Sequence, residues 1–579
     1  MMIPPRSKGR ATTHARILWA IPCLALAVLL PAPAGVTRAA TYEVAQHDPV
    51  ATDDGPGTPE KPWKTLAQAA RQAAPGDQVN IHDGIYREHV EFKTSGTAEQ
   101  PIRFQAAPGA HVVLTGADPL TGWHRLDGPR NIYTIAWPHR FIGWNANMTH
   151  PDDEYHRLIG RCEQVAVDGY LLRQVLEAGH LAPGSFWVDV SNQVLQVWDA
   201  GNRDLNQTHV EGATRTEIAL VTGSHVQLAG LYFRWAANLA QHGAVVLSGT
   251  NDLLEDCVVE DMNASGATLA GVDLVVRRCT FRDNGQLGFG ANGAHRLRFT
   301  DCLVENNNTK GFSRGWEAGG NKLVLCRDAV LDHCRFLRNR GCGVWFDIGN
   351  ENCTVQNCLV ADNEDGGIFD EISFGLQAHD NVVTGNGFAE SAGAWGAQAG
   401  ITLSSSPESV IERNLLVGNR EGFDFREQTR TTPRIGQREE VPVWNHDEII
   451  RHNLIVLNRD AQVWGWFDRP DNRHWPDPKT AEHPQNLGDL HLQFIGNIYY
   501  ADRGQGLIGW GPTWSRHRSY ARLADFQTEL GIDQGGGVWE PKFANAPARD
   551  FRLPSSSPVE FRAAQPQGSV PDCSLGWRE

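Results

Sequence analysis

The chain has 579 residues, with 19 Trp and 59 Gly against only four Met, a composition that favours a β-rich protein over a helical one. Its 52 basic and 68 acidic side chains give a formal net charge of −16. This excess of acid argues against nucleic acid and anionic membrane surfaces as partners, because both are negatively charged.

Residues 1–40 have the pattern of a secretory signal peptide. Basic side chains come first, an apolar run follows over residues 17–30, and small residues continue through Ala40. The apolar run is shorter than the roughly 20 residues that a bilayer-spanning helix needs. We therefore expect this segment to be removed and the mature chain to be secreted, into the periplasm or the extracellular space, without a membrane anchor.

Two segments precede the main repeat. Residues 41–126 read as a strand, a short amphipathic helix over Leu66 to Ala74, and then the first coils of a stacked structure. Such a helix covers the open end of the core, which repeat proteins need for solubility. Residues 127–212 break the repeat and contain the strand-like alternations GSFWVDV and NQVLQVW, so we expect a small β insertion domain there.

One short phrase recurs between residues 250 and 460, within a repeat region that we expect to cover residues 213–500. It reads CTFRDN from Cys279, CLVADN from Cys358 and NLLVGN from Asn414. Most copies are 22 to 24 residues apart, and three units are longer, at 32, 33 and 39 residues. One alternating strand per unit, no helical pattern, and Asn or Gly at the turns indicate an all-β fold, a right-handed parallel β-helix. Residues 501–579 then form the C-terminal coils and tail.

The two ends of the phrase predict internal ladders of like residues. The closing Asn can bond through its amide to the equivalent Asn of the next coil. The opening position is cysteine in successive coils, which favours a buried stack of free thiols over a disulfide framework. Zinc is disfavoured because no close CxxC pair is present. These stacked cysteines are Cys257, Cys279, Cys302, Cys334 and Cys358.

The three longer coils indicate where a binding site would form. Their extra residues fall at Lys310 to Gly319, Phe388 to Ala399 and Arg426 to Asp447. In a repeat structure, insertions emerge as loops on one side, and such loops usually build the binding surface. The first loop carries Trp316 and the second carries Trp395.

Two acids occupy the same position on consecutive coils. Asp347 lies 13 residues after Cys334, and Glu371 lies 13 residues after Cys358. If the alternating apolar residues face the core, both acids face outward, about 5 Å apart on neighbouring strands. Carboxyl groups about 5 to 5.5 Å apart are typical of retaining glycosidases, one acting as nucleophile and the other as proton donor.

Further candidate residues converge on the same face. The coil before Asp347 places Lys322 level with Trp345 and Phe369, and Glu317 lies on the loop just before it. The aromatic rings would stack against sugar rings, together with Trp316 and Trp395 from the loops. The alternative is that the acids are ordinary solvated surface residues and Lys322 an ion-pair partner. Arg426, in the downstream GFDFREQ, is either structural or a substrate clamp.

At these residues the chain resembles glycoside hydrolase family 120, a β-xylosidase family whose parallel β-helix is interrupted by a β-sandwich. The resemblance covers most of the chain, and GWEAGGNKL, GVWFDI and FDEIS carry it most specifically. It implies that Asp347 is the nucleophile, Glu371 the acid/base, and Glu317 a further acid of the site. It also implies a β-sandwich-like insertion and no cofactor.

Three hypotheses follow for the function. The first is a retaining glycoside hydrolase acting on a polysaccharide or oligosaccharide, which requires no metal. The second is a polysaccharide lyase of the same fold, with Lys322 as base and calcium held by acidic residues. The third is a non-catalytic glycan-binding β-helix.

Overall fold

The structure is a computed structural model. It describes residues 39–141, 161–389, 398–428, 430–467, 490–511, 518–564 and 566. The predicted signal segment up to residue 38, and Trp395, lie outside these described residues.

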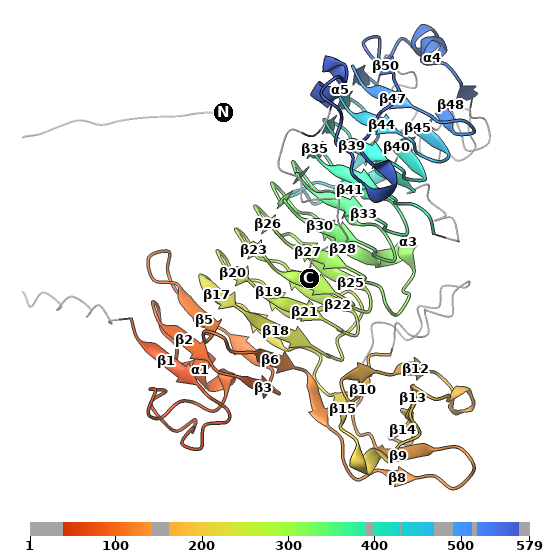
Figure 1. Cartoon of the computed structure of the whole chain (residues 1–579). Helices are drawn as coiled ribbons and strands as arrows, with labels where there is room; N and C mark the ends of the chain where they lie inside the picture. The colour runs from red at the N-terminus through yellow and green to blue at the C-terminus, as the bar shows by residue number, and fades with distance from the viewer. Residues whose placement is uncertain are drawn as a thin grey trace, which may run out of the picture. The chain divides into compact units, whose positions relative to one another are not determined.

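Three sheets of 13 strands each form the main body (Figure 1). Each coil gives one strand to every sheet: β31 (Val344–Asp347) is followed by β32 (Thr354–Gln356) and β33 (Leu359–Ala361), and β34 (Ile368–Glu371) begins the next coil beside β31. We call the sheet that contains β31 sheet II, the sheet that contains β32 sheet I, and the sheet that contains β33 sheet III. This arrangement confirms the β-helix predicted from the repeat.

The strands of all three sheets are short, which suits a repeat of about two dozen residues. Sheet II contains β4 (Val90–Phe92), β16 (Ala219–Val221), β19 (Gly243–Leu247), β22 (Ser265–Leu269), β25 (Leu287–Asn292), β28 (Gly319–Val324), β31, β34, β37 (Ala399–Ser404), β40 (Glu421–Glu427), β45 (Ala461–Phe467), β48 (Gly506–Gly511) and β49 (Arg518–Tyr520). Sheet I contains β1 (Thr41–Val44), β2 (Gln78–Ile81), β5 (Ile102–Ala106), β17 (Val226–Ala229), β20 (Leu253–Glu255), β23 (Val275–Arg277), β26 (Arg298–Thr300), β29 (Val330–Asp332), β32, β35 (Gln377–His379), β38 (Val410–Glu412), β43 (Ile449–Arg451) and β46 (Gln493–Ile495). Sheet III contains β3 (Gly84–Tyr86), β6 (Val112–Thr115), β18 (Leu231–Arg234), β21 (Val258–Glu260), β24 (Thr280–Arg282), β27 (Leu303–Glu305), β30 (Arg335–Leu337), β33, β36 (Val382–Thr384), β39 (Leu415–Val417), β44 (Leu454–Val456), β47 (Ile498–Tyr500) and β50 (Gly537–Val538).

Both predicted ladders line the interior. In the asparagine ladder, Asn339 Nδ2 donates to Asn363 Oδ1 at 2.9 Å, and Asn363 Nδ2 donates to Asn386 Oδ1 at 2.9 Å. The five stacked cysteines are buried and free, as expected. Cys358 is followed along its ladder by Asn381, whose Oδ1 accepts from the Cys358 backbone N–H at 2.9 Å. These ladders fix the register between coils because a slipped coil would leave buried amides unpaired.

The helix α1 (Leu66–Gln72) closes the N-terminal end of the core. Thr65 caps it by accepting from the backbone N–H of Gln68, and its apolar side packs into the main core cluster. The prediction placed the helix end at Ala74, two residues later. The helix ends sooner because Pro75 disfavours helical backbone at the residue before it.

The expected insertion leaves the β-helix between β6 and β16. Its strands form two small sheets, with a separate core that includes Trp123, Trp137 and Phe186. Most of their pairs are antiparallel, but β12 and β13 pair in parallel. The strands are β7 (Ala117–Pro119), β8 (His124–Arg125), β9 (Ile132–Ala136), β10 (Val165–Val167), β11 (Tyr170–Leu171), β12 (Arg173–Val175), β13 (Ser185–Asp189), β14 (Val194–Trp198) and β15 (Val210–Ala213).

Helices are few and short. Among the residues that the structure describes, none is long and apolar enough to cross a membrane. Besides α1, the α-helices within the described ranges are α3 (Arg314–Glu317), α4 (Leu523–Leu530) and α5 (Val559–Ala564).

Candidate active site

Asp347 and Glu371 lie on the outer side of sheet II. The register pairs Trp345 with Phe369, so the two acids, two residues further along each strand, are neighbours across the same pair of strands. Adjacent strands are about 4.8 Å apart. The inward residues between them, Val344, Phe346 and Ile368, belong to the main core. The predicted alignment and the outward direction are therefore confirmed, although the acids are only 8% and 6% exposed.

Lys322 contacts Asp347, the loop that carries Trp316 and Glu317, and the ring of Trp345. Its Nζ is 2.9 Å from Asp347 Oδ2 and 3.9 Å from Glu317 Oε2. It also donates to the carbonyl oxygen of Trp316 at 3.2 Å and lies 4.3 Å from the ring centre of Trp345. Since a cation over an indole ring is attracted to the π face, Trp345 helps to hold the ammonium against Asp347.

Glu317 is held by the first of the three long loops. Glu317 is the last residue of the short helix α3, and Gln286 Nε2 donates to the backbone carbonyl of Glu317 at 2.7 Å. Gln241 Nε2 donates to its carboxylate at 2.5 Å. Burial raises the pKa of Glu317, and the nearby Lys322 ammonium partly offsets that effect. The side chain is thus an acid that retains its proton to a higher pH than a solvated glutamate.

The third long loop brings an arginine that the sequence alone did not single out. Its residues form a hairpin of β41 (Arg430–Pro433) and β42 (Glu440–Val443), and Arg430 Nη1 makes an ion pair with Glu371 Oε1. Arg434 and Arg438 lie in the same hairpin, so composition could not show which arginine reaches the acid.

Apolar contacts fix this hairpin beside the two acids. Val443 and Val441 pack against Ile348 and Ile372, the residues that directly follow Asp347 and Glu371. Both isoleucines have left-handed backbone, with φ of 57° and 42°, which is strained for a β-branched residue. The packing supports this turn and so fixes where the strands carrying the acids end.

The aromatic residues do not form the open stacking surface that was expected. Trp345 and Phe369 face outward but are 4% and 3% exposed, because they pack with Cys342 and Lys322 lies over Trp345. Trp316 is half-buried and packs beside Phe312. Trp395 cannot be placed, since it lies outside the described residues.

Arg426 stands in the same outward row as the acids, two strands beyond Glu371. The register pairs Glu371 with Ser404 and Ser404 with Arg426. Arg426 is buried, and its Nη2 donates to Gln428 Oε1 at 2.8 Å. It does not adjoin the acid pair directly, and its role as a clamp stays a prediction.

Behind the acid pair is another acid, which sequence reasoning missed. Asp370 points into the core between Phe369 and Glu371, and it is fully buried. Burial raises its pKa to about 8, an effect that the hydroxyls of Ser406 and Ser409 partly offset. Strand alternation alone could have identified it, because an acid at an inward position is unusual.

The donor groups do not fit a calcium site of the kind that the lyase hypothesis requires. Within the described ranges, no group of three or more His, Cys, Asp or Glu side chains is arranged to hold a metal ion. Asp347 is paired with Lys322, and Glu371 with Arg430.

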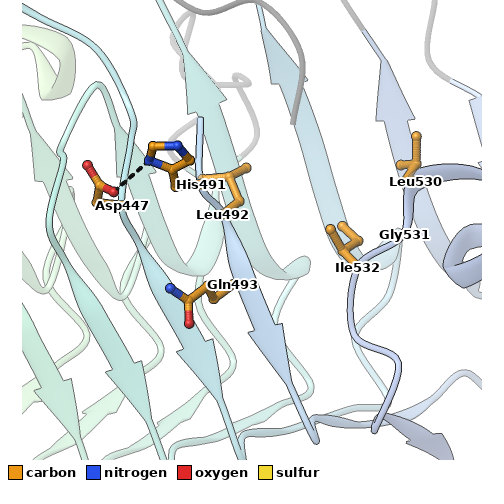
Figure 2. A pocket seen from close by; sticks show the side chains of 7 residues that line it. All are labelled: Asp447, His491, Leu492, Gln493, Leu530, Gly531 and Ile532. Atoms are coloured by element: carbon orange, nitrogen blue, oxygen red, sulfur yellow. Dashed lines mark hydrogen bonds and ion pairs between the residues drawn. The ribbon is translucent and has the colours of Figure 1, made fainter. Parts of the chain in front are cut away.

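A hollow lies elsewhere, on the downstream coils, and Figure 2 shows its lining side chains. His491 Nδ1 lies 3.0 Å from Asp447 Oδ1 at its edge. None of the predicted site residues lines it. The lining residues are Asp447, His491, Leu492, Gln493, Leu530, Gly531 and Ile532.

Comparisons with known proteins support the fold. Residues 194–327 and 243–416 match the family described as right handed beta helix region, and residues 61–124 match chondroitinase B. The structure of XylC in complex with xylose aligns over 87% of each chain, with a TM-score of 0.64 and 17% identity. AlyGC, a PL6 family alginate lyase, aligns over 92% of this chain and 57% of its own, with a TM-score of 0.46 and 10% identity.

A curated relative matches only a short stretch. Uncharacterized protein YwoF of Bacillus subtilis (strain 168) is 43% identical over 68 residues, which are 12% of this chain and 14% of that protein.

These findings define the class of protein. The chain is a right-handed parallel β-helix protein, with a small β insertion and a capped N-terminal end. It shares this fold with XylC.

Proposed function

We propose that the protein is a retaining glycoside hydrolase. The observation that carries this proposal is the pair of outward acids, Asp347 and Glu371, one strand spacing apart, with a lysine bound to the first. That spacing of about 5 Å leaves no room for a water between the acid and the sugar, so one acid attacks the sugar directly.

The surroundings of each acid suggest its role. Asp347 Oδ2 is held by the Lys322 ammonium, which orients the carboxyl group for attack on the anomeric carbon. Glu371 would protonate the leaving oxygen and then activate water. Arg430 contacts Oε1 of Glu371, so Oε2 is the oxygen that would meet the substrate. Glu317, whose pKa burial raises, supports the site as a further proton-holding acid.

We propose a neutral oligosaccharide or polysaccharide as substrate, with xylose units as the first candidate. XylC was solved with xylose, and the sequence motifs of this chain resemble those of a β-xylosidase family. The described site holds three acids, Asp347, Glu371 and Glu317, against two cations, Lys322 and Arg430. This excess of acid does not favour a strongly anionic sugar.

The test is a screen of aryl glycosides and plant and algal polysaccharides, with the product anomer followed by NMR. Asp347→Asn and Glu371→Gln should each lower kcat by about a hundredfold or more, since each removes an acid-base or nucleophilic group. Product with inverted configuration, or full activity in both variants, would refute the proposal.

A lyase is the second candidate, because the N-terminal coils match chondroitinase B and Lys322 lies in the site. The catalytic base of a lyase needs a free lone pair to accept the proton of the sugar. Lys322 does not offer one in this arrangement, because its Nζ is in an ion pair with Asp347. Unsaturated product absorbing in the ultraviolet, with activity lost in chelator, would favour this reaction. Glycan binding without turnover, unchanged in Asp347→Asn, would indicate a binding protein.

We also propose that the protein is exported. The support is the order of basic, apolar and small residues in residues 1–40. N-terminal sequencing of the mature protein from the periplasm or medium tests this, and an intact N-terminus in the cytoplasm would contradict it.

A further inference from the structure

Two short hydroxyl side chains lie directly beside the acid pair. On β37, Ile401 and Leu403 belong to the core, so Thr402 and Ser404 face outward. The register places Thr402 beside Phe369 and Ser404 beside Glu371. Both are 0% exposed, and neither hydroxyl oxygen has a hydrogen-bond partner within the described part of the chain.

The next strand adds two longer polar side chains to the same rows. On β40, Asp424 lies beside Thr402 and Arg426 beside Ser404. Both are buried, and Asp424 Oδ1 has no hydrogen-bond partner among the described residues. Trp464 on β45 lies beside Asp424 and is half-buried. A carboxyl, a guanidinium, two hydroxyls and an indole therefore follow Glu371 along sheet II.

Unpartnered polar atoms at this depth call for an explanation. Most buried side-chain polar atoms in native proteins have a hydrogen-bond partner, and leaving one without costs about 1–3 kcal/mol. Here three such atoms cluster: Thr402 Oγ1, Ser404 Oγ and Asp424 Oδ1. Thr402 and Ser404 are on the strand next to that of Glu371, about 5 Å away, and Asp424 is on the following strand, about 10 Å away. A bound molecule with several hydroxyls would satisfy all three.

The chemistry of the cluster fits a sugar. Sugar hydroxyls both donate and accept, so they suit hydroxyl, carboxyl and guanidinium partners placed side by side. The indole of Trp464 offers an apolar face and a polar edge, as sugar rings require. Burial raises the pKa of Asp424 well above its usual range, so its carboxyl can donate as well as accept a hydrogen bond, as the hydroxyls of a neutral sugar require.

We propose that Thr402, Ser404, Asp424 and Arg426 bind one neutral sugar unit next to Glu371, on the side of β37 and β40. Trp464 packs against that sugar or the next. The inference rests on the proposed function for the role of Glu371, but binding can be measured without turnover. It also gives the direction of the substrate: from the acid pair toward the C-terminal coils.

The test measures binding of xylobiose, cellobiose and β-1,4-galactobiose by calorimetry, in the full mature chain carrying Asp347→Asn so that nothing is hydrolysed. Thr402→Val is isosteric and removes only the hydroxyl, and Asp424→Asn removes the acid group while keeping the size of the side chain. Each should weaken the Kd of the bound disaccharide about tenfold, as expected for one lost hydrogen bond to a buried group. Thr280→Val, on the outer face of sheet III, is the matched control and should leave the Kd unchanged.

The outcomes separate the two proposals. Unchanged Kd values in Thr402→Val and Asp424→Asn overturn the sugar site, whether or not the wild type hydrolyses glycosides. Absence of binding for all three disaccharides also overturns it. If binding weakens as expected while the wild type hydrolyses nothing, the sugar site stands and the hydrolase proposal fails. Thermal melting of each variant identifies one that has not folded, and the other variant then decides.

Discussion

Arg430 forms an ion pair with Glu371 although it lies 59 residues further along the chain. The contact depends on the β41–β42 hairpin, which packs on Ile348 and Ile372. A guanidinium in this position orients a carboxylate that would otherwise rotate among several rotamers. Arg430 is thus a positioning residue for the proposed acid/base.

We predict that Arg430→Ala lowers kcat/KM on an aryl glycoside about ten- to hundredfold, the range for losing a hydrogen bond to a charged group. Arg430→Lys should recover only part of the activity, because an ammonium lacks the fixed fork of a guanidinium. Arg438→Ala, at an exposed site in the same hairpin, serves as control and should behave as wild type. Equal activity in Arg430→Ala and Arg438→Ala would show that the ion pair does not position Glu371.

Asp370 predicts how stability depends on pH. Burial raises its pKa from the usual 3.8 to about 8 in the folded chain. Between these values the unfolded chain has released the proton and the folded chain has not, so this group destabilises the fold increasingly as pH rises. The slope is at most about 1.4 kcal/mol per pH unit.

Asp370→Asn removes this titration while keeping the shape of the side chain. We expect the stability of the variant relative to wild type to improve steadily from pH 5 to pH 8, as measured by urea unfolding at each pH. Comparing the two proteins cancels the other buried acids, such as Asp365, whose pKa burial raises to about 6. A difference that stays constant over this pH range would mean that Asp370 is ionised in the folded protein.

At the scale of single elements, the asparagine ladder links one coil to the next. Asn363 accepts from the side chain of Asn339 and donates to both Asn386 and the carbonyl of Phe336, all at 2.9–3.0 Å. We predict that Asn363→Ala lowers the free energy of unfolding by about 3 kcal/mol, since it leaves several buried groups unpaired. Asn292→Ala, at an exposed strand position, should change it by less than about 0.5 kcal/mol in the same chemical denaturation. Similar losses in both variants would contradict a special role for the ladder.

The elements that sequence predicted well are those with a period. The spacing of Asn363 and its equivalents predicted strands, ladders and the outward placement of Asp347 and Glu371, because each coil repeats one set of backbone positions. Arg430 could not be predicted, since its hairpin has no counterpart in other coils and its contact is set by packing. The burial of Trp345 was also missed, because strand alternation gives the side of the sheet and not what lies over it.

At the scale of the whole molecule, the outer face of sheet III changes character along the repeat. On β24 the outward residues are Thr280 and Arg282, but on β33 they are Leu359 and Ala361. From β33 onward this face is mostly apolar, with Thr384 on β36 as a polar exception, and the C-terminal segment packs on it through Phe551 and its neighbours. An exposed apolar strip of that length would otherwise favour aggregation.

The contacts of the C-terminal segment reach several coils back. Arg549 Nη1 pairs with Asp362 Oδ2 at 2.6 Å, beside β33, although the two residues are 187 positions apart. Phe543 and Phe551 pack with ring centres 5.3 Å apart against the same apolar strip. The segment therefore ties the last coils to the coil that carries Asp347, and its loss would loosen the coils that carry the proposed sugar site.

We predict that ending the chain after Lys542 lowers the melting temperature by several degrees and causes concentration-dependent association, seen by light scattering. The physical reason is that removal of the apolar contacts of residues 543–564 uncovers the strip on sheet III, at roughly 25 cal/mol per Å² of apolar area. Ending the chain after Pro566 keeps every one of those contacts and is the matched control. If the shorter protein stays monomeric and melts with the control, the C-terminal segment does not protect this face.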